Sequence, residues 1–260
     1  MSLNLMNRRQ EQGRSNGSST VRARRRIVWR ASVLFFAVLV GTLIATILGK
    51  WTVLPVLEVV SIWLLFIWFT MRFFRDPNPR VPQTSGVIVA PAHGKVDAIE
   101  EMDEPKVMGG RCLRISIFLS IFDVHVQNAP VAGRVDMVCH CPGQFLNAMK
   151  RASATQNENL LMGFRSLERP DEKIGVRLIA GFIARRIVAW VQPGEEVARG
   201  DRIGLIQFGS RCDLYLPTNY QVLVKCGDHV VGGETMVAAR EQPGAHDVIS
   251  DTGSHAFISS

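Results

Sequence analysis

The apolar residues of this chain form two long runs near the N-terminus and many short runs after residue 80. Residues 31–49 carry no charged side chain, and a second apolar run, residues 51–71, is interrupted by Pro55 and Glu58. The first run is just long enough to cross a bilayer as a helix, whereas the glutamate weakens the case for the second. Residues 31–72 therefore predict a helical hairpin that either crosses the membrane and returns or dips into one leaflet.

Positive charge stands at both ends of this hairpin. Residues 1–30 contain eight arginines and one glutamate, and Arg72 and Arg75 follow the second run. By the positive-inside rule both ends lie in the cytoplasm, where the arginines also attract anionic headgroups. The alternative, a buried helical pair in a soluble core, leaves the run lengths and the basic flanks unexplained. We therefore expect the protein at the cytoplasmic face of the cell (inner) membrane.

The same N-terminal arm accounts for the net charge of +7. The arm contains eight of the 30 basic residues and one of the 23 acidic residues, so the rest of the chain has 22 of each. The arm is rich in Ser, Gly and Arg, a composition that predicts disorder. A folded region without excess positive charge gives no support to nucleic-acid binding.

Beyond the Pro-rich segment 73–82 the chain changes to short β-branched runs separated by glycines, which predicts mostly β-structure. Two internal repeats divide this region. APAHGKVD (90–97) returns as APVAGRVD (129–136), and VQPGEEVARGDRI (191–203) returns as VKCGDHVVGGETM (224–236). The glycines of the second repeat are expected in turns that need positive φ. The predicted fold is α+β, with a β-rich, pseudo-duplicated barrel or sandwich behind the N-terminal membrane hairpin.

Two further segments of the β-rich region have their own patterns. Residues 143–162 carry apolar side chains at helical spacing and predict the one helix outside the hairpin. The sequence CHC contains two thiols and an imidazole, but on a strand Cys139 and Cys141 would face one way and His140 the other. We therefore expect no metal site there.

The run LIQFGSRCDLYLP (205–217) reads as a strand interrupted by Gly209 and Ser210. Glycine weakens a strand and marks either a plain bulge or a close approach of the backbone. The pair also permits a reaction in which the Ser210 hydroxyl attacks the Gly209 carbonyl and converts the peptide into an ester. Loss of the serine α-proton then expels the Gly209 carboxylate, and the dehydroalanine left behind hydrolyses to a pyruvoyl group and ammonia. A pyruvoyl ketone binds an amine substrate covalently and acts as an electron sink, as pyridoxal phosphate does.

The most distinctive stretches occur in this order: FFRDP (73–77), VIVAPAHGKV (87–96), IFLSIFDVHVQNAPVAGRV (117–135), GQFLNAM (143–149), NEN (157–159) and residues 183–217. Together they resemble phosphatidylserine decarboxylase proenzymes, in particular the short, membrane-associated bacterial and archaeal form. The resemblance implies a catalytic domain over residues 73–260 that cleaves itself between Gly209 and Ser210. Residues 1–209 would form the β subunit, and residues 210–260 the α subunit that begins with the pyruvoyl group. The implied reaction converts membrane phosphatidylserine to phosphatidylethanolamine and CO2. The resemblance leaves open whether the protein forms a homodimer.

The resemblance also implies roles for two histidines. His125, in DVHVQNAP, matches the first histidine of the longer members' YHRxH motif and is expected to give or take the proton at the substrate α-carbon. Asp123, two residues earlier on the same strand face, is expected to orient it. His93 stands where the family usually has an aspartate that helps a histidine to activate the cleavage serine. Either His93 is itself the base, or self-processing is slower or relies on another acid.

A carboxylate-bearing headgroup calls for a cation, and Arg211 and Arg186 are the candidates because guanidinium groups bind carboxylate and phosphate. Solvation at the surface is the alternative for these side chains. Two other functions remain open. One is the same chemistry on another seryl lipid, such as archaetidylserine. The other is a non-catalytic membrane-anchored adaptor, because the second repeat resembles the hammerhead turns of biotinyl and lipoyl domains. A carrier needs a lysine at a hairpin tip, whereas Lys225 is expected within a strand.

Overall fold

The structure is a computed structural model that describes residues 28–49, 54–144, 156–181, 187–206 and 210–240. The basic arm, Gly209, Arg186 and the middle of the helix predicted for residues 143–162 lie outside the described residues.

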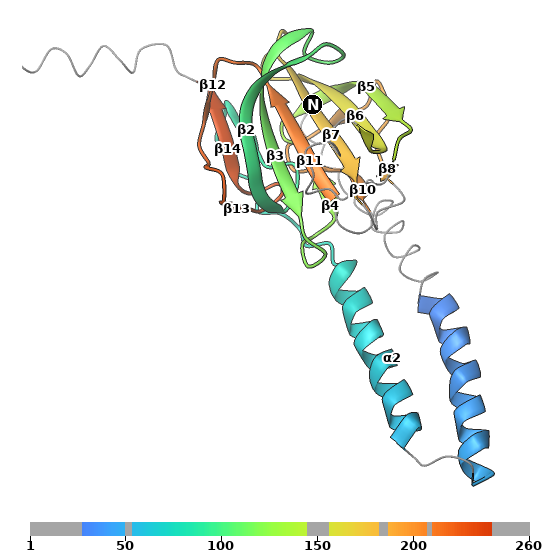
Figure 1. The fold of residues 1–260 in the computed structure, drawn as a ribbon. Coiled ribbons are helices and arrows are strands. Elements are labelled where there is room, and N and C mark those ends of the chain that lie inside the picture. Colours follow the sequence, from blue (N-terminus) through green and yellow to red (C-terminus); the bar gives the residue numbers. More distant parts are fainter. Residues whose placement is uncertain (1–27, 50–53, 145–155, 182–186, 207–209, 241–260) are drawn as a thin grey trace, which may run out of the picture.

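Two apolar helices form a hairpin that extends away from the β-rich part of the molecule (Figure 1). They are the first helix, Val28–Ile47, and α2, Leu54–Phe73, and the rings of Phe35 and Trp63 stack between them with centroids 4.8 Å apart. Both helices are long and apolar enough to cross a membrane, and only 6% and 11% of their apolar spans are buried. This exposure agrees with the predicted membrane hairpin and differs from that of a helical pair buried in a soluble core.

The rest of the described chain is built almost entirely of strands. They are β1 (Val87–Val89), β2 (Gly94–Glu104), β3 (Gly110–Leu119), β4 (Val126–Asn128), β5 (Gly133–Cys141), β6 (Asn159–Ser166), β7 (Lys173–Ala180), β8 (Ile187–Ala189), β9 (Glu196–Val197), β10 (Arg202–Ile206), β11 (Ser210–Leu216), β12 (Tyr220–Val222), β13 (His229–Val230) and β14 (Met236–Arg240). All strand pairs are antiparallel.

The strands form one large sheet and two small sheets, and their arrangement is internally duplicated. The large sheet has the order β13-β2-β3-β11-β7-β6-β5-β9, and it curls into a half-barrel (Figure 1). Its two halves correspond strand by strand about the β11-β7 pair. The small sheets, β1-β14-β12 and β4-β10-β8, correspond in the same way. The predicted α+β fold with a pseudo-duplicated β-rich core is confirmed.

The two sequence repeats meet each other in space. The second copy of the long repeat supplies β13, which pairs with β2 at the first copy of the short repeat, whereas the first copy supplies β9, which pairs with β5. The turn glycines of both copies have positive φ, as predicted: Gly194 (93°), Gly200 (81°), Gly227 (102°) and Gly233 (75°). Each half of the molecule is therefore closed by a hairpin that comes from elsewhere in the chain.

Three details differ from the sequence predictions. Residues 159–162, predicted to end a helix, begin strand β6, because Leu160 and Leu161 are buried on opposite faces of the sheet rather than on one helical face. Lys225 lies in the loop between β12 and β13, not in a strand, and its N–H donates to Asp228 Oδ2. Residues 205–217 do not form one strand, because β10 and β11 belong to different sheets.

The CHC segment alternates as predicted. On β5 the sulfurs of Cys139 and Cys141 lie 3.8 Å apart, while His140 Nε2 lies 3.0 Å from Glu158 Oε1. Within the described ranges, no three His, Cys, Asp or Glu side chains are grouped to hold a metal ion.

Candidate active site

Ser210 is the first residue of β11, and its neighbours on both sides are central strands of the large sheet. It pairs with Leu119 at the end of β3 and with Ala180 at the end of β7. Alternation along β11 turns its side chain to the same face as Cys212, which packs in the main hydrophobic core. Ser210 is fully buried, and its Oγ has no hydrogen-bond partner within the described residues. A buried hydroxyl without a partner is costly, so Ser210 is a candidate for a chemical role.

His125 is connected to Ser210 by two short routes. It lies six positions after Leu119, the strand partner of Ser210, and its carbonyl accepts a hydrogen bond from the N–H of Ile206, four positions before Ser210. A chain of four residues spans at most about 14 Å. The backbone therefore holds the predicted histidine and the predicted cleavage serine at one end of the large sheet.

The His125 ring is buried at the point where the membrane hairpin meets the β-rich part. It is 1% exposed and packs against Phe73, the last residue of α2, with ring centroids 4.3 Å apart. Its Nδ1 lies 2.9 Å from the backbone carbonyl oxygen of Asp123. A carbonyl can only accept, so Nδ1 carries the proton and the neutral ring has its lone pair on Nε2.

Asp123 does not orient His125 in the predicted manner. The residues before β4 form a turn, not a strand, and the carboxylate accepts hydrogen bonds from the Ser120 N–H and from His229 Nε2, at 2.8 and 3.1 Å. Asp123 acts on His125 through its backbone carbonyl instead. The period-2 argument failed because Ser120 and Asp123 close the turn with an Asp123 N–H to Ser120 O bond of 3.0 Å.

His93 joins the same neighbourhood from the start of β2. The residues whose charges affect the pKa of His93 include Asp123, His229 and Arg75. Asp123 and Arg75 also affect the pKa of His125. Arg75 reaches the turn directly, because its Nη2 donates to the carbonyl of Phe122 at 2.7 Å. The fold thus brings together residues that lie up to 154 positions apart in the sequence, between Arg75 and His229.

Burial keeps both histidines uncharged. Desolvation, opposed by the backbone hydrogen bond at Asp123, lowers the pKa of His125 from 6.5 to about 4. Desolvation also lowers the pKa of His93, and Arg75 adds to this effect. At neutral pH both imidazoles are therefore uncharged and can accept a proton, and the lowered pKa makes each a weaker base than an exposed histidine.

The lowered pKa of His125 predicts a loss of stability in mild acid. Between its unfolded pKa of 6.5 and its folded pKa of about 4, the unfolded chain binds a proton that the folded chain excludes. Stability is then complete above pH 6.5 and falls by up to about 3 kcal/mol as the pH drops to 4. Denaturant unfolding in detergent micelles across this range should give a shallower pH slope for His125→Asn than for the parent. Equal slopes would contradict the assignment.

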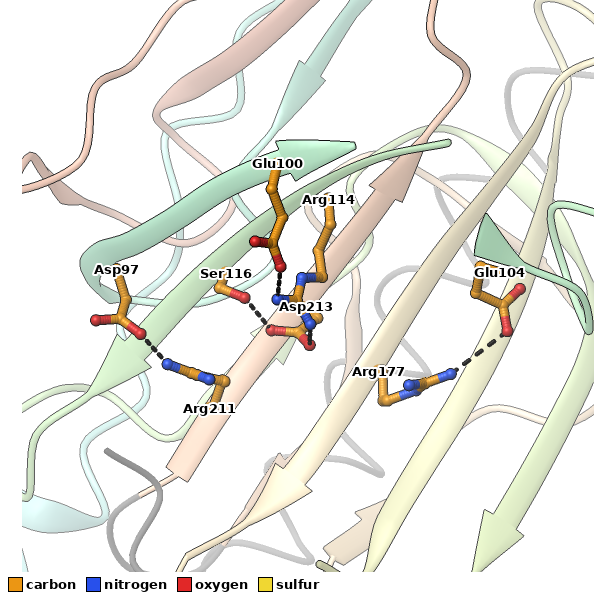
Figure 2. Close-up of polar contacts among 8 residues, drawn as sticks. All are labelled: Asp97, Glu100, Glu104, Arg114, Ser116, Arg177, Arg211 and Asp213. Atoms are coloured by element: carbon orange, nitrogen blue, oxygen red, sulfur yellow. Dashed lines mark hydrogen bonds and ion pairs between the residues drawn. The ribbon is translucent and has the colours of Figure 1, made fainter. Parts of the chain in front are cut away.

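Arg211 lies on the opposite face of β11 from Ser210, away from the two histidines. It is 4% exposed and pairs with Asp97, whereas the neighbouring Asp213 accepts a hydrogen bond from Ser116 Oγ at 2.5 Å and faces Arg114 at 3.5 Å. Figure 2 shows these contacts. The structure does not bring Arg211 together with Ser210.

Asp213 is the centre of this buried charge network. It is 0% exposed, and burial raises its pKa, opposed by Ser116 and three arginines. We expect Asp213→Ala to lower the free energy of unfolding by about 3–5 kcal/mol, because it leaves buried guanidinium groups without their shared anion. Ser116→Ala removes only one donor and should cost about 1–2 kcal/mol. Denaturant unfolding measures both, and a smaller cost for Asp213→Ala than for Ser116→Ala would contradict this account.

Sequence reasoning missed His229 and Arg75. A signal for His229 is present in the long repeat, where it replaces Glu196 of the other copy at an otherwise matching position. Likewise His93 replaces Ala132 in the short repeat. A position-by-position comparison of the two copies identifies His229 and His93, because each is a titratable histidine that the other copy lacks.

Comparison with known proteins gives a consistent result. The family model described as "Phosphatidylserine decarboxylase" matches residues 66–238. A "Phosphatidylserine decarboxylase proenzyme" of Desulfotalea psychrophila is 44% identical over 68% of this chain and 81% of its own length. One of Symbiobacterium thermophilum is 38% identical over 84% and 98%. A "Putative archaetidylserine decarboxylase proenzyme" of Methanothermobacter thermautotrophicus is 45% identical over 68% and 82%.

Proposed function

Because this chain belongs to the phosphatidylserine decarboxylase family, and is therefore a decarboxylase made as a proenzyme, we propose that it cleaves itself between Gly209 and Ser210. The new N-terminus at residue 210 becomes a pyruvoyl group, and the processed enzyme converts phosphatidylserine to phosphatidylethanolamine and CO2. Residues 1–209 and 210–260 remain associated, because β11 is held between β3 and β7 by strand pairing along its length.

The buried, unpartnered hydroxyl of Ser210 is the observation that carries this proposal. A serine hydroxyl is a weak nucleophile unless a base accepts its proton. His125 and His93, both kept neutral by burial, supply bases at the same end of the sheet. The hydroxyl oxygen bonds to the Gly209 carbonyl carbon, the C–N bond breaks, and the amide nitrogen leaves as the amine of residue 210. A base then removes the residue 210 α-proton, and the Gly209 carboxylate departs.

The two histidines have separate tasks. His93 stands where the family usually has an aspartate, and we assign it to proton transfer during self-cleavage. His125 acts at the substrate α-carbon, with its Nδ1–H fixed by the Asp123 carbonyl. The pyruvoyl group, when formed at position 210, supplies the electron sink for loss of CO2. Arg211 has a structural task on the other face of β11, beside Asp97.

Attachment to the membrane fits a lipid substrate. The acyl chains of phosphatidylserine stay in the bilayer, so the reacting headgroup has to be met at the membrane surface. Phe73 ends α2 directly against His125, which ties the hairpin to the catalytic histidine. We assign the enzyme to the cytoplasmic face of the cell membrane.

A mass spectrum of the purified protein tests the proposal. We expect two fragments, residues 1–209 and a C-terminal fragment that begins with a keto group in place of the Ser210 amine. An uncut chain, or a C-terminal fragment with an ordinary serine, would refute it.

Which lipid carries the seryl headgroup is a separate question. The relative named for archaetidylserine supports an alternative substrate with the same seryl headgroup but different lipid chains. Release of CO2 from vesicles that contain either lipid distinguishes the two. Preference for phosphatidylserine is the expected result, and a preference for archaetidylserine would change the substrate but not the chemistry.

A further inference from the structure

The turn between β3 and β4 has an unusual composition. The hydrogen bond from the Asp123 N–H to the Ser120 carbonyl defines a four-residue turn, and its two central residues are Ile121 and Phe122. Central turn positions normally carry Gly, Pro, Asn, Asp or Ser, because the corner of a turn faces water. Ile121 is 37% exposed and Phe122 is 60% exposed. Outside the two apolar helices, Phe122 is the most exposed large hydrophobic side chain of the described residues.

This turn lies where the membrane hairpin joins the β-rich part. In Figure 1 the end of β3 lies beside the end of α2. Arg75 connects the two, because its Nη2 donates to the Phe122 carbonyl at 2.7 Å and its Nη1 donates to the carbonyl of Arg72, in the last turn of α2, at 2.8 Å. The apolar turn is therefore fixed beside the C-terminal end of α2.

The charges around the turn also suit a membrane surface. The Asp123 carboxylate is only 15% exposed and contacts the Ser120 N–H and the exposed His229, so it does not accompany the two apolar tips. Arg72 and Arg75 beside the turn favour anionic headgroups. The apolar surface of α2 continues close to this level with Trp68 and Met71, each 58% exposed.

We propose that the Ile121–Phe122 turn inserts into the headgroup–acyl boundary of the bilayer as a membrane contact separate from the hairpin. The partner is a lipid surface, and the contact forms whether or not the chain is processed. This membrane contact is separate from the proposed reaction, but its consequence for His125 rests on that reaction. His125 follows Phe122 by three residues, so insertion holds the catalytic histidine at the depth of the substrate headgroup.

Tryptophan fluorescence in vesicles tests the contact. Phe122→Trp is introduced into the full-length Ser210→Ala chain, and vesicles of phosphatidylcholine and phosphatidylglycerol carry bromine on their acyl chains. The emission of the five native tryptophans is subtracted by recording the spectrum of the Ser210→Ala chain without the added tryptophan. We expect the added emission to be shifted to the blue, quenched at least about twofold by brominated lipid, and protected from aqueous iodide.

Leu167→Trp is the matched control. Leu167 is 43% exposed and directly follows β6, whose first residue lies at the Ser210 end of the sheet, so Leu167 lies at the far end. Its added emission should be quenched by iodide and not by brominated lipid. The same pattern for Phe122→Trp would overturn the proposal. Shielding of Phe122→Trp from both quenchers would also overturn it, because a second copy or another part of the chain would then cover the turn.

The test is independent of self-cleavage, since Ser210→Ala is already unable to form the proposed prosthetic group. A failure of the membrane contact therefore leaves the fragment pattern of the parent enzyme unchanged. Conversely, an uncut parent chain would refute the proposed function without altering the quenching result.

Discussion

Ser210→Ala is expected to yield a single uncut chain without decarboxylase activity. Alanine has no oxygen to attack the preceding carbonyl, so the peptide bond stays intact and no ketone forms at residue 210. Activity should fall by at least about 10⁶-fold, to the background rate, because the electron sink is missing rather than misplaced. Denaturing electrophoresis measures the cleavage, and CO2 release from phosphatidylserine vesicles measures the activity.

Ser116→Ala provides the matched control for this experiment. Ser116 is also a fully buried serine, on the adjacent strand β3, but its hydroxyl donates to Asp213 on the opposite face. It should lose stability and still be cut. Equal loss of cleavage in both variants would show that the result reports folding, and an active Ser210→Ala chain would exclude Ser210 as the source of the prosthetic group.

His125→Gln is expected to separate catalysis from processing. Glutamine keeps a hydrogen-bond donor near the Asp123 carbonyl but cannot exchange a proton near neutral pH. We expect CO2 release per processed chain to fall about 10²–10⁴-fold, the usual contribution of a general acid or base. The fraction of cut chain is read from the same sample on a denaturing gel.

Two further histidine variants complete this test. His140→Gln removes an exposed histidine paired with Glu158 on β5 and should keep full activity. His93→Ala should slow the appearance of the two fragments, because we assign His93 to self-cleavage. Full activity of processed His125→Gln would remove His125 from the catalytic step, and normal cleavage of His93→Ala would leave another base to activate Ser210.

Two histidines near the candidate site occur in only one half of the duplicated fold. His93 and His229 have Ala132 and Glu196 at the matching positions of the other half, although both halves keep the same strand pairing and turn glycines. The duplicated backbone therefore serves stability in both halves. The repeat is broken at side chains near His125, whereas the backbone plan is kept.

The sequence by itself predicted the apolar hairpin, the β-rich class and the duplication, and it singled out Ser210 and His125 as candidate site residues. These features rest on local properties: the length of an apolar run, the spacing of glycines, and motifs whose residues are neighbours in the chain. Repeated glycines were predictable in particular, because a positive φ is required wherever the chain turns in that way.

Only the tertiary structure decided which side chains share the site. Asp123 lies in a turn and not on a strand, Arg211 faces Asp97 on the far side of β11, and His229 arrives from a hairpin more than one hundred residues away. Strand alternation gives opposite faces to Ser210 and Arg211, but only the packed sheets reveal which face holds the histidines. Long-range pairing between β13 and β2 depends on burial of the whole core, and no local pattern encodes it.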